Sequence, residues 1–374
     1  MLSPLSPTRA LISLSALRRN LQAVRTCVGE DVQIMAVVKA NAYGHGAARI
    51  AAEAVAWGCT CLGVARVGEG IELRESGIGT RTLVFELLPG GSEEAALRNN
   101  LELTVSGLDG ATRIDRAAAA LNLKAGVHAK VDTGMNRLGI DFRIAASVID
   151  QIARLRHLEL RGVYSHFATS DDPDSGFAVE QLERFQRVLA ELEQKKIPAG
   201  IRHMANSGAI MTLPASHFDL VRPGIMMYGY APRRSMAVKV TLHPVLSLRS
   251  IVTLVKTVPA GSSISYGRRY TTREETAIAT VPVGYADGYP RLLTNNVDLL
   301  INGKRFPVVG TICMDHIMAD LGSASNVKEG DEVVLIGRSG NEAIDSWVLA
   351  ERVGTIPYEI TCQISPRVLR LFVE

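Results

Sequence analysis

This 374-residue chain has little that points to a membrane, a nucleic acid or an oxidising compartment. No apolar stretch is long enough to span a bilayer, and the first residues lack the charged start and apolar block of a secretion signal. Basic residues (41) barely outnumber acidic ones (38), which argues against nucleic-acid binding. The five cysteines have no metal-ligand or redox-motif spacing, as is typical of free thiols. We therefore expect a cytoplasmic protein without a metal site.

The first two-thirds of the chain alternates short apolar runs with amphipathic or alanine-rich stretches, of which Ala47–Trp57, Ile144–Leu155 and Ala178–Lys196 are the clearest helices. Continuous apolar strands alternating with helices indicate a parallel sheet covered by helices. Eight such strands predict an α/β fold with an N-terminal (β/α)8 TIM-like barrel, although periodicity alone leaves an open doubly wound sheet as an alternative. The runs are Ile34–Val38, Cys61–Ala65, Thr82–Phe85, Leu101–Val105, Gly126–Val131, Leu160–Ser165, Ile201–Met204 and Asp219–Val221.

The pattern changes near residue 240, where alternating strands and tight turns replace helices. An Asn302-Gly303 turn is typical of a β-hairpin, and helical periodicity is confined to Ser346–Val353. We therefore predict two domains, a barrel over residues 1–240 and a mostly-β domain over residues 241–374. The predicted strands of the second domain lie within Leu246–Val258, Glu275–Val283, Val297–Ile301, Phe306–Leu321 and Glu332–Ile336.

Lys39 follows the first apolar run and precedes a loop that ends in Tyr43-Gly44-His45-Gly46. A lysine at the end of a buried strand loses solvation, so its pKa falls and a neutral amine can attack a carbonyl. The glycines let the backbone approach a ligand closely, and the tyrosine and histidine add polar groups. The pattern is typical of a Schiff-base lysine, although many strand-end lysines only reach into water.

Polar residues also follow nearly every other predicted strand, where a barrel carries its functional groups. Two late loops, His203–Ala209 and Arg222–Ile225, place small residues and backbone N–H groups where a barrel often binds phosphate. Pyridoxal 5′-phosphate would use both features, with an aldehyde for Lys39 and a phosphate for these loops. The residues after the strands are Lys39, Arg66, Glu86, Ser106, Asp132 with Arg137, His166, Asn206 with Ser207, and Arg222.

Six segments, in order across both predicted domains, resemble the signatures of the alanine racemase family. The resemblance implies a pyridoxal-phosphate enzyme that interconverts L- and D-alanine by a two-base mechanism. The segments are Ala36-Val37-Val38-Lys39-Ala40-Asn41-Ala42-Tyr43-Gly44-His45-Gly46, Lys130-Val131-Asp132-Thr133-Gly134-Met135-Asn136-Arg137-Leu138-Gly139, Ser165-His166-Phe167-Ala168, Arg222-Pro223-Gly224-Ile225, Ser265-Tyr266-Gly267 and Cys313-Met314-Asp315.

The resemblance assigns Lys39 as the cofactor-bearing lysine and as the base on one face of the substrate's Cα. Tyr266 is the implied acid/base on the other face, with His166 near its hydroxyl and Arg222 behind both. Two bases are needed because a single base tends to return the proton to the side from which it came. Arg222 is also implied to face the pyridine nitrogen, and an arginine donor there leaves that nitrogen unprotonated.

The remaining roles come from the same resemblance. Arg137 is implied to contact the cofactor's phenolic oxygen and the substrate carboxylate, and Lys130 resembles a lysine that many members carry as a carbamate. Asn136 departs from the glycine that is common in that loop. The phosphate is expected to bind Tyr43, Ser207, the backbone of Gly224 and Ile225, and Tyr358. Met314 is implied to bind the substrate carboxylate, and Cys313 and Asp315 to support its loop. The residues implied to line the corridor by which substrate enters are Tyr285, Arg291, Asp172 and Ile356.

The family resemblance also implies a head-to-tail homodimer, in which the β-domain of one subunit covers the barrel mouth of the other. The substrate would be a small amino acid, with neither a nucleic acid nor a membrane as partner. Three alternatives remain open: a serine or broad-specificity racemase, an amino-acid decarboxylase, and a carrier or regulatory protein that binds pyridoxal phosphate without turnover.

Overall fold

The computed structural model describes residues 7–172, 176–238, 240–323 and 325–374. Contacts divide the chain into a barrel unit, Leu17–Ala42 with Ala47–His243, and a β unit, which joins Pro244–Glu374 to Tyr43–Gly46 and to the described residues up to Ala16. In the part of the chain that the structure describes, no helix is both long and apolar enough to cross a membrane.

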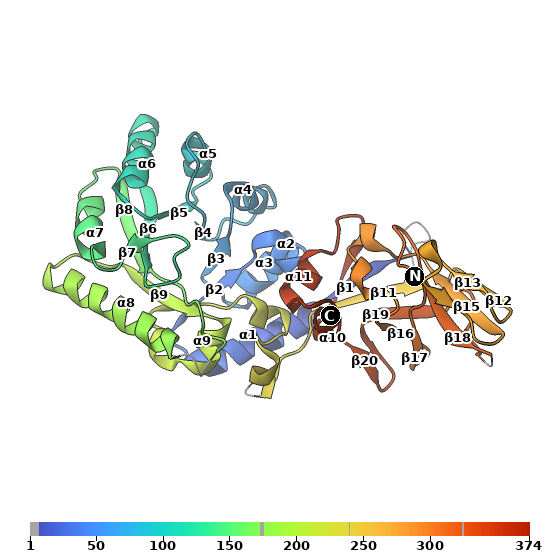
Figure 1. Ribbon diagram of the computed structural model, residues 1–374. Coiled ribbons are helices and arrows are strands. Elements are labelled where there is room, and N and C mark those ends of the chain that lie inside the picture. The colour runs from blue at the N-terminus through green and yellow to red at the C-terminus, as the bar shows by residue number, and fades with distance from the viewer. Residues whose placement is uncertain (1–6, 173–175, 239, 324) are drawn as a thin grey trace. The chain divides into compact units, whose positions relative to one another are not determined.

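Eight parallel strands close the barrel unit, as the sequence predicts (Figure 1). The neighbours run β5-β4-β3-β2-β10-β9-β8-β6, and pairing of β5 with β6 completes the circle. That closure excludes the open doubly wound alternative. A short β7 (Ile140–Asp141) extends the sheet beside β6. The barrel strands are β2 (Gln33–Val37), β3 (Cys61–Val64), β4 (Thr82–Val84), β5 (Glu102–Val105), β6 (Ala125–Asp132), β8 (Leu158–Tyr164), β9 (Ile201–Asn206) and β10 (Leu220–Arg222).

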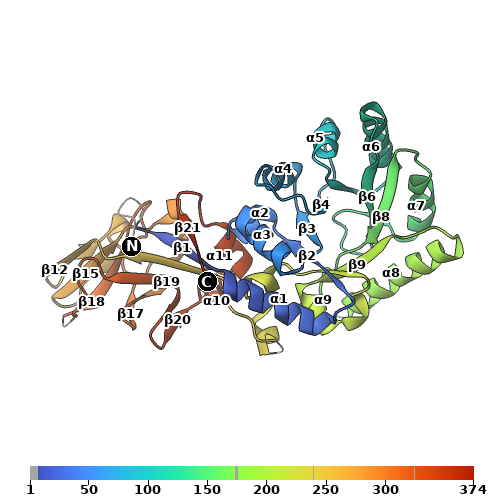
Figure 2. The ribbon, with the colours of Figure 1, turned by 180° about the vertical axis from the view of Figure 1, so that it is seen from behind.

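Amphipathic helices cover the outside of the strands, as Figure 2 shows for α1 and α8. In α8 the buried Leu182, Phe185, Val188 and Leu192 recur at helical spacing, so one face packs inward. The helices are α1 (Leu14–Val28), α3 (Ala47–Trp57), α4 (Val67–Glu75), α5 (Glu93–Arg98), α6 (Leu108–Leu121), α7 (Ala145–Ala153), α8 (Phe177–Gln194) and α9 (Ser207–Thr212).

The described residues of the β unit form three sheets and the short α-helices α10 and α11. Its largest sheet has the order β17-β16-β19-β11-β1-β21 with β20 on β19, beside a three-stranded sheet β12-β15-β18 and the hairpin β13–β14. The bounds are β1 (Arg9–Ser13), β11 (Leu246–Ile251), β12 (Leu254–Val258), β13 (Ser263–Ile264), β14 (Tyr270–Thr271), β15 (Thr276–Val281), β16 (Asp298–Ile301), β17 (Lys304–Pro307), β18 (Ile317–Gly322), β19 (Glu332–Ser339), β20 (Glu342–Ile344), β21 (Leu369–Val373), α10 (Ser346–Val353) and α11 (Pro357–Cys362).

The start of the chain differs from the predicted domain span. β1 lies within residues 1–240, predicted as the barrel domain, but it pairs antiparallel with β11 and parallel with β21 and so belongs to the β unit; residues 1–6 and 239 of that span lie outside the described residues. Within the predicted range Phe306–Leu321 lie the last residues of β17 and most of β18, and the segment between them forms a loop.

Candidate active site

Lys39 lies directly after β2 at the carboxyl ends of the barrel strands, and four residues with positive φ follow it. Ala40, Asn41, Ala42 and Tyr43 have φ values of 52, 52, 53 and 55°. This left-handed turn contains no glycine, although each L-residue in that conformation costs roughly 1–2 kcal/mol. Such strain persists only where the surroundings hold it and is concentrated at functional sites.

Three hydrogen bonds hold this turn. Ala42 N donates to Val38 O at 2.8 Å, and Ala47 N donates to Asn41 Oδ1 at 2.8 Å. Ala40 N donates to Glu69 Oε1 at 2.6 Å, while the other oxygen of Glu69 accepts from Ala65 N at 2.7 Å. Glu69 therefore ties the loop after β2 to the loop after β3 and fixes the backbone that carries Lys39.

Arg222 ends β10 and is buried, and its guanidinium makes polar contacts with four residues. It donates to Ser165 O at 2.7 Å and to Met204 O at 3.0 Å. It also meets the Nδ1 atoms of His203 at 2.7 Å and of His166 at 3.1 Å. Because arginine only donates, both of these Nδ1 atoms must accept. His166 is thereby left with its proton on Nε2.

Burial and nearby positive charges, Arg222 first among them, lower the pKa of His166 well below its usual value. The imidazole is therefore neutral at pH 7 and presents an Nε2–H donor. Burial also lowers the pKa of Arg222 to about 10, which leaves it cationic at neutral pH. The barrel mouth thus combines a fixed cation with a neutral donor.

Lys130, near the end of β6, is only 4% exposed. Burial, followed by the charges of Arg137 and Arg222, lowers the pKa of its amine to about 7. Its Nζ lies 5.4 Å from the ring centroid of Tyr164. The lowered pKa gives Lys130 a neutral amine form near pH 7, and that form can react with an electrophile.

The loop after β6 carries Arg137 and gives a reason for the asparagine at 136. Asn136 has a φ of 54°, a conformation that glycine favours and that asparagine tolerates better than other L-residues. Asp132 Oδ1 accepts from Gly134 N at 2.9 Å and from Asn136 N at 3.1 Å. Replacement of glycine by Asn136 is thus compatible with this backbone. Arg137 itself is exposed.

Ser207 begins α9 and is suited to an anion. Its Oγ accepts from Gly224 N at 2.9 Å and from Met226 N at 3.2 Å, and the residue is buried. Its hydroxyl hydrogen has no acceptor among the described residues and is available to donate. Gly224 N–H, which the sequence assigns to the phosphate, donates to Ser207 here, while Ile225 begins the following 3-10 turn.

In the β unit, Tyr266 stands on a strained loop with its side chain 73% exposed. Ser265 before it has a φ of 64°. Ser265 Oγ donates to Thr311 O at 2.6 Å and lies 3.3 Å from Cys313 Sγ, and Thr311 Oγ1 donates to Tyr266 O at 2.6 Å. These bonds fix the backbone of Tyr266 and leave its phenol free to meet another molecule.

Two further loops adjoin each other in the same unit. Tyr285 N donates to Cys313 O, and Ala286 N donates to Met314 O, both at 3.1 Å. A Cβ on Gly284 would lie 2.2 Å from Met314 O, so only glycine fits there. Tyr285 and Met314 are exposed on these loops.

Asp315 and Tyr358 each contact another side chain of the β unit. Arg367 donates to Asp315 Oδ1 at 2.8 Å and to Asp287 Oδ1 at 2.6 Å, which supports the predicted loop role of Asp315. Tyr43 and Tyr358 have ring centroids 5.9 Å apart within the β unit.

The barrel unit brings together Lys130, His166 and Arg222, and separately Ser207 with the loop that carries Gly224 and Ile225. The β unit brings together Tyr266 with Cys313, Tyr285 with Met314, and Tyr43 with Tyr358. Glu69, Thr311 and Arg367 were missed by sequence reasoning, because residues that only support a loop have no distinctive local pattern. In the described ranges, no group of three or more His, Cys, Asp or Glu side chains is placed to hold a metal ion.

A closed barrel with a lysine after its first strand, together with a β unit that presents an exposed tyrosine, defines a two-unit barrel enzyme. Models of the alanine racemase N-terminal and C-terminal domains match residues 12–232 and 245–372. The chain therefore belongs to the alanine racemase family, and it is an enzyme of that family.

Individual relatives agree over the full length. The alanine racemase of Symbiobacterium thermophilum is 44% identical over 371 residues, which cover 99% of this chain and 98% of the relative. The alanine racemase structure from Clostridium difficile 630 superimposes with a TM-score of 0.94 at 38% identity, covering 98% of this chain and 96% of that one. A Bartonella henselae alanine racemase structure with covalently bound pyridoxal phosphate gives a TM-score of 0.87 at 29% identity, covering 98% and 100%.

Proposed function

We propose that this protein interconverts L- and D-alanine with pyridoxal 5′-phosphate, using Lys39 and Tyr266 as bases on opposite faces of the substrate's Cα. The observation that carries the proposal is a pair of candidate proton carriers on rigidly held, strained loops in a chain that matches the family in both domains. Lys39 precedes a left-handed turn, and Tyr266 follows a serine of positive φ. Strain of this kind marks positions where function sets the geometry.

The residues present fit the cofactor. Lys39 supplies the amine, and the buried Ser207 has a hydroxyl hydrogen available for a phosphate oxygen. The Tyr43–Tyr358 pair is proposed to add two more neutral donors. When bound, pyridoxal phosphate supplies the electron-withdrawing ring that acidifies the Cα proton of an attached amino acid. The similar Bartonella henselae protein carries this group covalently.

Tyr266 is proposed to act as a base with the help of a hydrogen-bond donor from the barrel unit. Tyr266 starts from a pKa near 10, so it needs a donor to stabilise its phenolate at neutral pH. We infer that His166 is that donor, because Arg222 occupies its Nδ1 and leaves the proton on Nε2. Arg222 in turn is proposed to donate to the pyridine nitrogen, since a guanidinium has N–H donors and no acceptor that could take up a proton.

Lys130 is proposed to carry a carbamate that holds Arg137. Only a neutral amine adds carbon dioxide, and the lowered pKa of Lys130 supplies that form near pH 7. A carbamate would place a negative charge between Arg137 and Arg222, the two cations that depress this pKa most. Arg137 would then be held to bind the substrate carboxylate, with the backbone N–H of Met314 as a second donor.

The second base is proposed to come from a partner subunit in a head-to-tail homodimer. Tyr266, Tyr285, Met314 and Ile356 are all large, exposed side chains of the β unit, with exposures of 73, 42, 52 and 49%. Such side chains gathered on active-site loops are typical of a surface that another chain covers. A symmetric pair of such contacts gives a closed dimer.

The test follows L-alanine in deuterated water and measures optical rotation and Cα deuteration together. A racemase brings the rotation to zero with deuterium in both enantiomers, whereas a carrier leaves the substrate unchanged and a decarboxylase releases carbon dioxide. L-Serine in place of L-alanine distinguishes an alanine-specific from a serine or broad-specificity enzyme. Tyr266→Phe should lose the rate and keep the bound cofactor's absorbance; full activity in that variant would refute the two-base assignment.

A further inference from the structure

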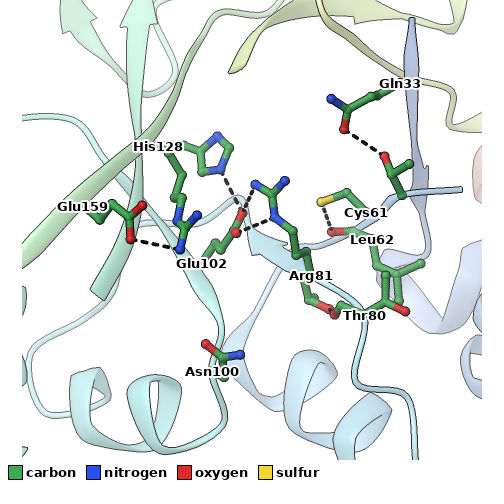
Figure 3. Close-up of polar contacts among 12 residues, drawn as sticks. Gln33, Cys61, Leu62, Thr80, Arg81, Asn100, Glu102, His128 and Glu159 are labelled. Carbon is green, nitrogen blue, oxygen red and sulfur yellow. Dashed lines mark hydrogen bonds and ion pairs between the residues drawn. The ribbon is translucent and has the colours of Figure 1, made fainter. Parts of the chain in front are cut away.

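A continuous line of hydrogen bonds runs up the barrel unit from the amino end of β5 to the carboxyl end of β10. Arg81 donates to both carboxylate oxygens of Glu102, at 2.8 and 3.2 Å. Glu102 Oε2 lies 2.9 Å from His128 Nε2, and His128 Nδ1 lies 3.0 Å from His203 Nε2. His203 Nδ1 then meets Arg222 at 2.7 Å. Figure 3 shows the outer end of this line, with Arg81, Glu102 and His128.

The two ends of the line fix every proton in it. Arg222 can only donate, so His203 must accept at Nδ1 and carry its proton on Nε2. That proton can only go to His128 Nδ1, which leaves the proton of His128 on Nε2, where an ionised Glu102 accepts it. All three links between Arg222 and Glu102 therefore have one direction, from Arg222 toward Glu102, where Arg81 donates from the other side.

The charge states agree with this assignment. Burial lowers the pKa of His128, and lowers that of His203 well below its usual value, so both rings are neutral at pH 7. Burial raises the pKa of Glu102, but hydrogen bonds from His128 and Arg81 outweigh it and bring the pKa to about 2. Glu102 is therefore an ionised acceptor throughout the physiological range.

Packing holds the planes of the two imidazoles in the line. Tyr164 stacks on His203 with ring centroids 4.7 Å apart and planes 3° from parallel. A Cβ on Gly162 would lie 2.5 Å from His128 Nδ1, so a glycine is required opposite that ring. The histidines cannot turn away from the line without displacing these neighbours.

We propose that Glu102, His128 and His203 form a one-directional relay that holds Arg222 in place for the reaction, so that Glu102 is a positioning residue at the opposite end of the barrel. Without an acceptor at 102, His128 is free to place its proton on Nδ1. That proton would face the Nε2–H of His203, and His203 could relieve the conflict only by placing its own proton against Arg222. Loss of Glu102 would thus bring two donors, the Nδ1–H of His203 and the N–H of Arg222, against each other and displace Arg222. The consequence for catalysis rests on the proposed function, in which Arg222 faces the cofactor ring.

The direct test is ¹⁵N-histidine NMR of the full-length protein with its cofactor bound, and again after the cofactor is removed. The assignments come from His128→Gln and His203→Gln. The relay predicts that both histidines are neutral with the proton on Nε2 in each state. A proton on Nδ1 of His203, or a doubly protonated ring, would overturn it. Because this measurement needs no turnover, it stands even if the protein fails to racemise alanine.

Variants then separate the relay from simple structural support. Glu102→Gln keeps an acceptor oxygen and should retain the tautomers and nearly all of kcat. The double variant Arg81→Met with Glu102→Met removes the acceptor without leaving a buried cation unpaired. It should shift His203 toward the Nδ1 tautomer and lower kcat roughly tenfold, the rate equivalent of one charged hydrogen bond, with a smaller change in KM for alanine.

The matched control is the neighbouring ion pair of Glu159 and Arg161, whose side chains lie 2.9 Å apart and take no part in the relay. Its double methionine variant should leave the tautomers and kcat unchanged. Unaltered tautomers and full kcat in the Arg81→Met, Glu102→Met protein would overturn the proposal. If that protein does not fold, the wild-type tautomers and the Glu102→Gln protein still decide the question. Failure of the wild type to racemise alanine would count against the proposed function alone.

Discussion

Lys130 allows a quantitative test of how burial tunes the barrel mouth. Burial, with help from Arg137 and Arg222, lowers the pKa of its amine to about 7 in the folded protein, whereas an unfolded lysine titrates near 10.4. Between these two values the unfolded chain binds a proton that the folded chain does not. The free energy of unfolding must therefore rise with pH across this window, and the contribution is lost as the pH falls.

The size of the effect follows from the two pKa values. From pH 7 to pH 9 the Lys130 contribution should raise the free energy of unfolding by about 2 kcal/mol. Lys130→Met keeps most of the side-chain volume and removes the titrating amine. From pH 7 to pH 9, the free energy of unfolding of this variant should therefore rise by about 2 kcal/mol less than that of the wild type. Lys124→Met, which alters an exposed lysine, serves as the control and should keep the wild-type slope.

The measurement is urea unfolding followed by circular dichroism at pH 7, 8 and 9 in buffer free of carbon dioxide. Other titrating groups are shared by the two proteins, so they cancel in the difference. Parallel pH profiles for the wild type and Lys130→Met would refute the account of this site. Addition of ¹³C-bicarbonate should give a carbamate signal in the wild type and none in the variant, which checks the proposed modification separately.

Three other substitutions test the local geometry. Asn136→Ala should destabilise the protein by about 1 kcal/mol and weaken alanine binding, whereas Asn136→Gly should do neither, because only the alanine is strained at positive φ; equal unfolding midpoints for the two would contradict this. Arg222→Gln should cost about 3 kcal/mol of stability by removing a buried cation with several hydrogen bonds, measured by thermal unfolding. Gly284→Ala should lower kcat/KM by displacing the Met314 loop, while Gly90→Ala, with nothing within 4 Å of the added Cβ, should be unchanged.

Much of the barrel was predictable because its strands are buried on both faces and therefore appear as continuous apolar runs. All eight runs correspond to barrel strands, and the helix predicted over Ala47–Trp57 has those bounds in the structure. The strand β1, at Arg9–Ser13, was not predicted, and its place in the β unit could not be, because its partners β11 and β21 lie more than 230 residues away in the chain. Local pattern contains no information about such pairing.

Lys39 could be singled out as a candidate by its place after a buried strand, whereas Tyr266 became a candidate, and Arg222 gained its role, only through the family resemblance, and their roles stay a prediction. The geometry around them was not predictable. The left-handed turn after Lys39 contains no glycine, the residue type that would have predicted positive φ values there. The relay joins Glu102 to His128 and His128 to His203 across 26 and 75 residues of sequence, so its members become recognisable only when the barrel closes.

The central claim, that Lys39 of one subunit works with Tyr266 of another, is tested most directly by mixing two inactive proteins. Lys39→Ala and Tyr266→Phe are unfolded together in equal amounts, refolded with pyridoxal phosphate and assayed with L-alanine. In a shared-site dimer, half of the dimers are mixed, and each mixed dimer contains one intact site and one doubly altered site. Activity should therefore return to about a quarter of the wild-type value. If both residues of a site came from one chain, every site in the mixture would lack a base, and the absence of any recovered activity would contradict the account.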